Sequence, residues 1–379
     1  MIQRFIQKDI LDKIKDKKAI ILLGPRQCGK TTLLKSVAKR SGRSYIWFNG
    51  DNPADAQLLG GSSVARLKSL IGKNELIIID EAQDISGIGK TIKLITDYID
   101  GVCPVVSGSS SFELSSELSE PLTGRKYEYN LYPFSFSELL DNADLRTVVQ
   151  EIEQRLIFGS YPEVYTNPGR EKELLGLLAS SYLYKDIFKF GSLRKPAQFE
   201  KIVQLLAWQM GSEVNIYEVA QSAGTSSETV EHYIDMLEKA FIVFRLPAFS
   251  KNLRNEIKKN KKVYFYDNGI RNAVIGNYSL LENRNDVGAL WENYLVSERR
   301  KFNVYRHFYG HAYFWRTRQQ QEIDYIEEVD GSFAAWEFKW NPAKKTSFPL
   351  TFTKTYLPSK TEIIHRDNFE LFLSDEATT

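Results

Sequence analysis

The amino-terminal part of the chain, as far as Leu140, alternates short apolar runs with stretches of helical periodicity. Apolar residues dominate five runs of about five residues each, at 19–23, 45–48, 76–79, 102–106 and 127–131. Apolar residues at helical spacing occur between these runs, as in 30–40 and 89–99. Buried apolar strands that alternate with helices are typical of a parallel sheet covered on both faces. We therefore predict an α/β domain over residues 1–145.

The middle of the chain has a helical pattern that ends in two strand-like runs. Helical spacing extends through 171–190, 199–210, 216–223 and 227–240, and the strand-like runs are 241–246 and 262–266. The last two helices are joined by the tight corner Gly224-Thr225. Two helices around such a turn, followed by a strand pair, favour a helix–turn–helix with a wing. Residues 146–266 are thus predicted to be a helical and winged-helix region.

The carboxyl-terminal part changes pattern again. A helix is expected at 288–301, with strands at 312–316, 322–327, 333–340 and 361–365. We predict a further α/β domain over residues 267–379. Three regions agree with the two or three domains expected for a chain of 379 residues.

Net charge excludes a uniformly basic surface but permits local ones. The chain has 50 Lys and Arg against 48 Asp and Glu, a formal net charge of +2. Residues 1–40 hold eleven basic and three acidic residues, whereas 111–163 hold four and ten. Residues 245–262 hold seven basic residues and one acid, Glu256. A localised phosphate-binding surface is therefore compatible with the near-neutral total.

Cysteine content and hydropathy indicate the compartment. Cys28 and Cys103 stand far apart with no metal-binding spacing nearby, so we expect a reducing interior rather than a disulfide scaffold. The charged amino terminus is not a secretory signal. No apolar run reaches the roughly 18 residues that a membrane span requires. We predict a cytoplasmic protein without a membrane partner.

The strongest motif begins at the end of the first predicted strand. Residues 24–31 read Gly-Pro-Arg-Gln-Cys-Gly-Lys-Thr, a G-x-x-x-x-G-K-T phosphate-binding loop between a strand and a helix. Lys30 should reach the β- and γ-phosphates of ATP, and the Thr31 hydroxyl should bind Mg²⁺. The residues expected to contact the nucleotide and its ion are Gly24, Pro25, Arg26, Gln27, Cys28, Gly29, Lys30, Thr31, Thr32, Asp80 and Ser109.

A second motif ends the third predicted strand. The run at 76–79 is followed by Asp80-Glu81, which has the pattern of a Walker B segment. Asp80 would hold Mg²⁺ through water, and Glu81 would activate the attacking water. Two solvated acids at a strand end are the alternative. The phosphate-binding loop about fifty residues earlier favours hydrolysis.

Two further residues are candidates for the same reaction. Ser109, in Ser107-Gly-Ser-Ser after the fourth strand, lies where a sensor of the γ-phosphate is expected, although a plain turn fits equally. Arg125 precedes the fifth strand and is either an arginine finger toward a neighbouring subunit of a homo-oligomer or a surface arginine. Glu81, Lys30 and Arg125 form the predicted catalytic set.

The predicted winged helix raises the question of nucleic acid. Its second helix would present Ser226, Ser227, Thr229 and His232 to a groove of DNA. The basic segment 245–262 would neutralise phosphates. DNA is therefore a predicted partner. A winged helix used for packing or protein contact, with a solvated basic loop, is the alternative.

A third constellation lies near the carboxyl terminus. Glu337 and Lys339 share one face of a strand in a Glu-x-Lys pattern, and Asp324 lies on the strand before. With Glu292 on a helix, these residues resemble the metal site of restriction-endonuclease-like folds, in which a divalent ion generates hydroxide. A sheet edge with solvated charges, or a nuclease fold that binds without cutting, is the alternative. A second Glu-x-Lys, Glu256-Ile-Lys258, lies in the basic segment.

Six motifs carry a resemblance that spans nearly the whole chain. In order, they are GPRQCGKTT, LIIIDEAQ, SGSS, LTGR, LYPFSFSELL and FGSYPEV. Together they resemble AAA+-type P-loop ATPases of bacteria and archaea that carry a carboxyl-terminal restriction-endonuclease-like domain of unknown function. Tyr264-Phe-Tyr-Asp267-Asn-Gly269 resembles a further signature of the family, in which Asp267 is expected to be structural.

The expected function is therefore ATP binding and hydrolysis with Mg²⁺, coupled to DNA binding and to a metal-dependent nuclease-like site. The rival hypothesis is a nucleotide-gated switch for protein partners, whose nuclease-like domain is inactive.

Overall fold

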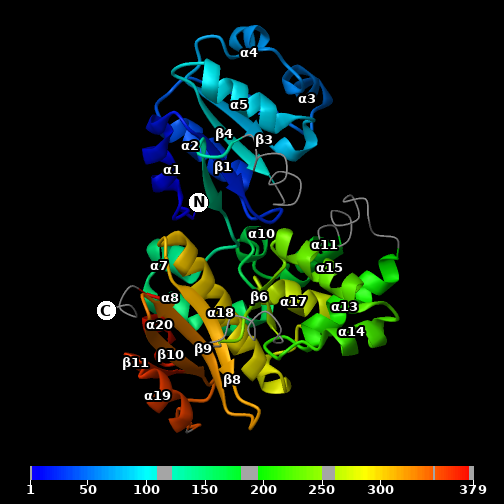
Figure 1. Cartoon of the computed structure of the whole chain (residues 1–379), viewed down its shortest axis with the longest axis vertical. Helices are drawn as coiled ribbons and strands as arrows, with labels where there is room; N and C mark the ends of the chain where they lie inside the picture. The colour runs from blue at the N-terminus through cyan, green and yellow to red at the C-terminus, as the bar shows by residue number, and fades with distance from the viewer. Residues whose placement is uncertain (1, 109–121, 181–194, 250–260, 345, 375–379) are drawn as a thin grey trace. The chain divides into compact units, whose positions relative to one another are not determined.

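The computed structural model describes residues 2–108, 122–180, 195–249, 261–344 and 346–374. Its fold divides into two compact units. The first unit comprises Met1–Phe134 with Lys239–Phe241, and the second comprises Ser135–Glu238 with Ile242–Thr379. Figure 1 shows the elements of both.

The first unit is built on a five-stranded parallel sheet, as predicted. The strand order is β2-β3-β4-β1-β5, with β1 Ala19–Leu23, β2 Tyr45–Asn49, β3 Leu76–Asp80, β4 Cys103–Gly108 and β5 Lys126–Asn130. Every residue of β1, β3 and β4 is buried, because these strands are central and apolar.

Helices precede and connect these strands along the chain. They are α1 Gln7–Lys13, α2 Lys30–Arg40, α3 Pro53–Leu59, α4 Val64–Ile71 and α5 Ile88–Tyr98, with short 3₁₀ turns η1 Ile14–Asp16 and η2 Ala82–Asp84. Helix α2 contacts β3 and β4, and α5 contacts β4. The alternation of strand and helix that the sequence predicted is confirmed.

The second unit begins with a group of helices. They are α7 Phe136–Asn142, α8 Leu145–Gln150, α9 Ile152–Phe158, α10 Pro162–Tyr165, α11 Glu171–Leu178, α13 Pro196–Trp208, α14 Ile216–Ala223, α15 Ser227–Lys239 and α17 Asn268–Ile275. Helix α14 begins where the Asn215 side chain accepts from the next turn and ends at Gly224, whose φ of +67° suits glycine. Strands β6 Val243–Leu246 and β7 Lys262–Phe265 then pair antiparallel, and Glu213 adds a bridge to Lys262.

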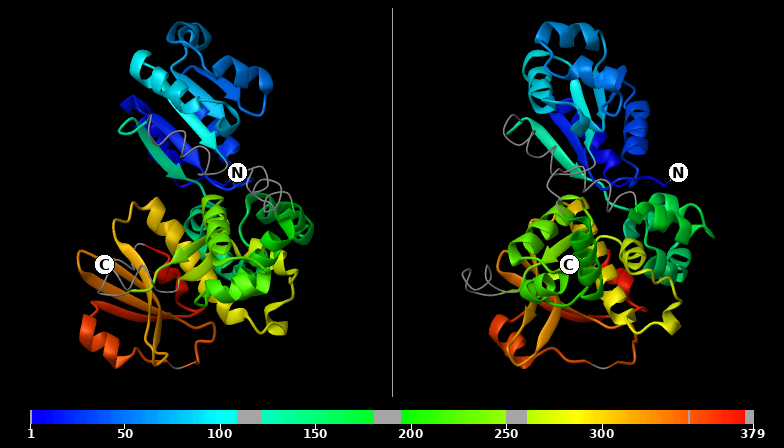
Figure 2. Two further views of the ribbon diagram at one scale, coloured as in Figure 1. Left: turned by 45° about the vertical axis from the view of Figure 1, so that its right-hand side comes forward. Right: turned by 90° about the vertical axis from the view of Figure 1, so that its right-hand side faces the viewer.

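A separate sheet completes the second unit. After η4 Leu281–Asn283 and the long helix α18 Val287–Tyr305, its strands are β8 His311–Arg316, β9 Glu322–Val329, β10 Ser332–Phe338 and β11 Lys360–Ile364, with α19 Leu350–Tyr356 and α20 Phe369–Phe372. The order is β11-β10-β9-β8, and of the three neighbouring pairs β10–β11 is parallel and the other two are antiparallel. This sheet is coloured orange to red in Figure 2. Its core contains Trp315, Ile326 and Phe352.

The backbone after β6 joins the edge of this second sheet. Ala248 bridges Phe314 of β8, and the Phe249 N–H donates to the Phe314 carbonyl at 2.6 Å. The aromatic ring of Phe249 is part of the same core. The segment that leaves the helical part is therefore also an element of the carboxyl-terminal sheet.

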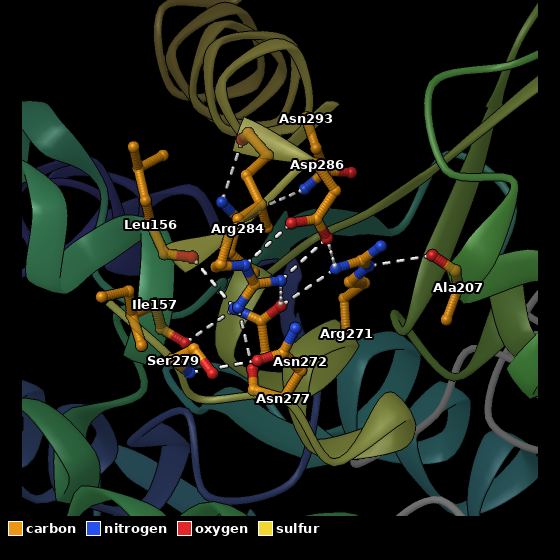
Figure 3. Close-up of polar contacts among 12 residues, drawn as sticks. Leu156, Ile157, Ala207, Arg271, Asn272, Asn277, Ser279, Arg284, Asp286 and Asn293 are labelled. Carbon is orange, nitrogen blue, oxygen red and sulfur yellow. Dashed lines mark hydrogen bonds and ion pairs between the residues drawn. The ribbon is translucent and has the colours of Figure 1, made fainter. Parts of the chain in front are cut away.

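A buried polar network also joins the helical part to α18 (Figure 3). Arg284 donates twice to the Asp286 carboxylate, with both distances 2.8 Å, and Arg271 donates to the same carboxylate at 2.5 Å. The Arg271 Nε also reaches the Ala207 carbonyl of α13, while Asn272 donates to two carbonyls of α9. This network spans residue 266, where the sequence analysis placed a domain boundary. The division into three domains stays a prediction.

Two of the sequence signatures meet around Asp267. Its carboxylate accepts from the backbone of Gly269 at 2.8 Å and of Ser160 at 2.7 Å. A Cβ at Gly159 would lie 1.9 Å from Asp267 Oδ1, so only glycine fits there. Burial raises the pKa of the Asp267 carboxyl. Asp267 begins α17 and fixes the FGSYPEV segment, which agrees with the structural role expected of it.

Candidate functional site

The phosphate-binding loop lies at the carboxyl edge of the parallel sheet. It leaves β1 after Leu23 and ends at Gly29, whose φ is +98°, where α2 begins. A Cβ at Gly24 would lie 2.1 Å from the Leu131 carbonyl oxygen, beyond the end of β5. The first glycine of the motif is therefore required by a close backbone approach. The loop precedes a helix amino terminus, which favours anions.

Lys30 lies across this loop. Its side chain is almost fully buried, and Nζ donates to the carbonyl oxygens of Gly24 at 3.0 Å and Pro25 at 2.8 Å. A phosphate would offer the same ammonium charged acceptors, which form stronger hydrogen bonds than carbonyl groups do. Lys30 is thus positioned by the loop that would hold the nucleotide.

Thr31 and Asp80 meet across the sheet edge. The Thr31 hydroxyl donates to Asp80 Oδ2 at 2.7 Å, although 49 residues separate them. Asp80 is 4% exposed. A hydroxyl and a carboxylate are oxygen donors of the kind that Mg²⁺ takes beside nucleotide phosphates. The donor set therefore fits the predicted ion, and the structure brings both predicted ligands together.

Ser107 is a residue of this site whose role the sequence analysis missed. It is the fully buried, next-to-last residue of β4, donates to Asp80 Oδ1, and accepts from the backbone N–H of Glu81 at 3.2 Å. The sequence analysis selected Ser109, which lies outside the described residues. The strand order could have identified Ser107. Because β4 lies between β1 and β3, its last residues lie at the carboxyl edge of the sheet, beside the phosphate-binding loop and Asp80.

Glu81 is held in an unusual position. Its φ of +50° is the left-handed region, which is uncommon for a residue with a side chain. The Gln83 side-chain amide donates to its carboxylate at 2.7 Å and to Asp84 at 3.2 Å. A Cβ at Gly50 would lie 2.0 Å from the Glu81 carbonyl oxygen. Gln83 and Gly50 were both missed, because neither belongs to the motif templates.

The remaining loop residues differ in exposure. Gln27 and Thr32 are exposed, Arg26 is half-buried, and Pro25 and Cys28 are buried. Burial raises the pKa of the Cys28 thiol, so it is a packing residue rather than a nucleophile. Direct nucleotide contact for these five residues stays a prediction.

Arg125 lies at the amino ends of the parallel strands, whereas the phosphate-binding loop lies at their carboxyl ends. It comes just before Lys126, which pairs with Ala19 at the amino end of β1. Its Nε forms an ion pair with Asp97 at 2.6 Å, and 43% of the side chain is exposed. Because the phosphate-binding loop follows the carboxyl end of β1, Arg125 lies away from the loop of its own chain. The finger toward a neighbouring subunit, and the homo-oligomer it implies, stay predictions.

The second constellation assembles in the carboxyl-terminal sheet. Asp324 lies on β9, and its Oδ2 accepts from the Phe338 backbone N–H at 2.8 Å. Lys339 Nζ lies 2.9 Å from Glu337 Oε2 and 3.6 Å from Asp324 Oδ2. The sequence placed these three residues together correctly. The lysine neutralises part of the charge that the two carboxylates bring.

Glu292 belongs to the same region but has a different partner. Its Oε1 accepts from Lys262 Nζ at 2.9 Å and from the Tyr264 hydroxyl at 2.7 Å. Lys262 is 1% exposed and also pairs with Glu322 at 2.6 Å. Burial by itself would lower the pKa of Lys262, but the negative charge of Glu292 and other nearby acidic groups raises this pKa well above its usual value. Lys262 and Tyr264 were missed, because they come from β7, outside the predicted domain.

These residues do not form a ready metal site. In the part of the chain that the structure describes, no group of three or more His, Cys, Asp or Glu is arranged to hold a metal ion. Burial and the Asp324 charge raise the pKa of Glu337 to about 7, against the effect of Lys339. Lys262 pairs with Glu292, and Lys339 pairs with Glu337, so both carboxylates predicted to bind a metal ion already have a lysine as their cationic partner. The metal role of Glu292, Asp324 and Glu337 stays a prediction.

Within the residues described, no helix is both long and apolar enough to cross a membrane.

Family comparisons divide the chain into three segments. Residues 16–140 match the family model described as an AAA domain. Residues 149–280 match a domain of unknown function (DUF8612), and residues 287–376 match another (DUF4143). The first unit is therefore an AAA-type P-loop domain, the architecture of a nucleotide-binding protein. The comparisons leave the nuclease-like part of the resemblance without support.

Relatives from bacteria and archaea align over most of the chain. An uncharacterized protein of Mycobacterium tuberculosis is 28% identical over 331 residues, covering 84% of this chain and 70% of the relative. An uncharacterized protein of Methanocaldococcus jannaschii is 23% identical over 85% of this chain and 75% of its own length. The Replication factor C large subunit of Methanococcus aeolicus is 35% identical over 21% of this chain and 18% of its own.

Two solved structures show a distant similarity to this chain. The Walker-type ATPase of Pyrococcus abyssi is 14% identical, covers 73% of this chain and 96% of its own, and gives a TM-score of 0.49. The Aeropyrum pernix ORC1 protein, solved in complex with DNA, covers 72% of this chain and 91% of its own at 13% identity and a TM-score of 0.34. Likenesses of this extent say nothing about activity.

Proposed function

We propose that the chain binds Mg·ATP at the loop 24–31 and hydrolyses it with Glu81 as the general base. The observation that carries this is the 2.7 Å contact between Thr31 and Asp80 at the loop edge of the sheet. Lys30 would hold the β- and γ-phosphates, and the bound ion would neutralise charge on the transferred phosphoryl group. Ser107 would keep Asp80 oriented, since it donates to the carboxylate oxygen that Thr31 does not use.

The test compares two lysines of the same helix. Lys30→Ala should weaken Mg·ATP binding at least about tenfold, the loss expected for a charge-assisted contact, and should abolish phosphate release. Lys35→Ala removes an exposed lysine of α2 and should match the wild type. Binding is measured with a fluorescent ATP analogue and turnover by phosphate release. ATPase activity of Lys30→Ala equal to that of the wild type would contradict the proposal.

For the second unit, we propose a partner-binding role controlled by this ATPase, with DNA as the first candidate partner. The support is the order of elements: α13, the Glu213 bridge, α14, α15, then the pair β6–β7. This is the order of a winged helix. The segment 245–262 adds seven basic residues and one acid.

Charge limits how DNA could be bound. Helix α15 carries four carboxylates but one lysine, so its surface repels phosphates. Arg245 forms ion pairs with three of them: Glu231, Asp235 and Glu238. Lys262 is buried between Glu292 and Glu322. Both ends of the basic segment are thus already neutralised, and DNA contact would depend on the lysines and the arginine between them.

The cluster of Asp324, Glu337 and Lys339 is compatible with two functions. Convergence of Asp324, Glu337 and Lys339 supports a metal-dependent phosphodiesterase, whereas the paired lysines support the rival, a nucleotide-gated switch with an inactive nuclease-like domain. Linear and circular DNA incubated with Mg²⁺ or Mn²⁺ separates them, comparing wild type with Glu337→Ala. Cleavage lost in Glu337→Ala supports the phosphodiesterase. Absence of both cleavage and low-salt DNA binding supports protein partners.

A further inference from the structure

Arg4 contacts the phosphate-binding loop from the amino-terminal segment. Its Nη1 donates to the Cys28 carbonyl at 2.6 Å, and a Cβ at Gly29 would lie 3.5 Å from the same nitrogen. The side chain is 6% exposed. Ile6 and Ile10, which are 3% and 0% exposed, anchor the adjoining turn in the core. The guanidinium is therefore fixed at the loop, although no motif includes it.

The other arm of the same guanidinium holds a different segment. Nη2 donates to the Tyr132 carbonyl, and the guanidinium lies 5.0 Å from the centre of the Phe134 ring. Phe134 is the last residue of the first unit before the chain enters the second. One rigid, planar cation thus contacts both the loop and the exit segment of the AAA-type domain.

The hydrogen bond from Arg4 to the Cys28 carbonyl affects the orientation of the loop peptide groups that would bind phosphate. A charged donor on a carbonyl holds that peptide plane in one orientation. Since the next N–H groups in such a loop point at the anion, fixing the Cys28 carbonyl helps to preset them. Any movement of the Cys28 carbonyl when phosphate binds must also move Arg4 or break its bond. Because Arg4 also holds the Tyr132 carbonyl, that movement has a direct route to the exit segment.

We propose that Arg4 is a positioning residue that couples nucleotide binding at the loop 24–31 to the exit segment 131–134. This rests on the proposed ATP binding and adds the residue that links the loop to the last residues of the first unit before Ser135. Arg4 is hydrogen-bonded to backbone carbonyls of Cys28 and Tyr132, so the role proposed for it is positioning rather than catalysis. Its role is to hold the loop in its binding form and to transmit the change in the loop backbone.

The test uses the full chain and Arg4→Lys, which keeps the charge but cannot reach two carbonyls with a planar fork. Arg4→Lys should raise the dissociation constant of Mg·ATP about tenfold while changing kcat less than threefold. Arg66→Lys, at an exposed arginine of α4, is the matched control and should match the wild type. Thermal melting reports on folding in each variant.

Amide hydrogen exchange distinguishes coupling from a merely structural role. In the wild type, saturating Mg·ATP should slow exchange in both 24–31 and 131–134. In Arg4→Lys, it should slow exchange in 24–31 only. Phe134→Leu keeps both hydrogen bonds, removes the ring contact, and should reduce the response at 131–134 partially.

Each outcome has one meaning. An equal nucleotide response at 131–134 in wild type and Arg4→Lys overturns the coupling, and so does a wild type that responds only at 24–31. If Arg4→Lys does not fold, the response in Phe134→Leu decides, and a response identical to the wild type overturns the proposal. A wild type that binds no Mg·ATP overturns the proposed function instead.

Discussion

The side-chain amide of Gln83 donates to the Glu81 carboxylate at 2.7 Å, so the proposed general base is held by a residue two positions further along the chain. Such a hydrogen bond holds the carboxylate in one orientation. It also fixes the carboxylate away from other partners. Gln83 therefore acts on Glu81 whether or not it touches the reaction.

Removing this hydrogen bond should raise turnover. We expect Gln83→Leu to increase kcat for ATP about threefold, with the affinity for Mg·ATP unchanged, because the freed carboxylate can turn toward the attacking water. Gln57→Leu, at an exposed glutamine of α3, is the control. Phosphate release at saturating ATP measures the effect. A fall in kcat would show that Gln83 orients Glu81 productively rather than restraining it.

Replacing Glu81 itself should separate chemistry from binding. Glu81→Gln keeps the shape of the side chain but removes the base, so kcat should fall about 10²- to 10⁴-fold. The dissociation constant of Mg·ATP should stay within about threefold of the wild type, since Lys30, Thr31 and Asp80 are intact. Single-turnover phosphate release with a parallel binding titration measures both. Turnover that survives this change excludes Glu81 as the base.

Two glycine-to-alanine changes should have opposite effects. Gly24→Ala places a Cβ 2.1 Å from the Leu131 carbonyl oxygen and should destabilise the first unit by about 1–3 kcal/mol, with loss of ATP binding. Gly176→Ala meets nothing within 4 Å in helix α11 and should stabilise the second unit by about 0.5–1 kcal/mol. Urea unfolding followed in each unit gives both values. A neutral Gly24→Ala would be inconsistent with the close approach.

Acid should weaken the second unit through Asp286. Burial alone would raise its pKa, but the ion pairs with Arg284 and Arg271 lower it from 3.8 to about 2. A lowered carboxyl pKa contributes stability that is complete above about pH 4 and is lost as pH falls through 2. Asp286→Asn should remove that part of the pH dependence and lower stability at pH 7. Urea midpoints between pH 7 and 2.5 measure this, with Asp51→Asn, at an exposed carboxyl, as control.

The buried pair Arg299–Glu327 should be costly to break singly. Arg299 donates to the two carboxylate oxygens of Glu327 at 2.9 and 2.7 Å, and both residues are at most 3% exposed. Arg299→Met leaves a buried carboxylate without its cation and should cost about 3–5 kcal/mol. Adding Glu327→Met should recover part of that loss. A double variant no more stable than Arg299→Met would show that the remaining partners of Glu327, rather than its charge, dominate.

Local pattern predicted the elements well and the long-range partners poorly. The strand predicted at 127–131 is Lys126–Asn130, and that predicted at 333–340 is Ser332–Phe338, because apolar runs and turns are local properties. The meeting of Thr31 and Asp80 followed from motif spacing and strand direction. The pairing of Glu292 with Lys262, on elements 30 residues apart, depends on packing that no local pattern encodes. Arg4 was missed for the same reason.

Residues 247–249 cover part of the outer edge of β8. An uncovered sheet edge is a template for pairing with another copy, and natural proteins cover such edges to remain dispersed. Residues 247–249 lie along β8 and use its Phe314 backbone groups in both directions, with bonds of 2.6 and 3.0 Å. These residues follow β6 directly. A fragment that contains the carboxyl-terminal sheet but lacks residues 247–249 would therefore expose the Phe314 N–H and C=O groups of β8. If such a fragment aggregated, the cause would be the missing segment 247–249 rather than instability of the sheet itself.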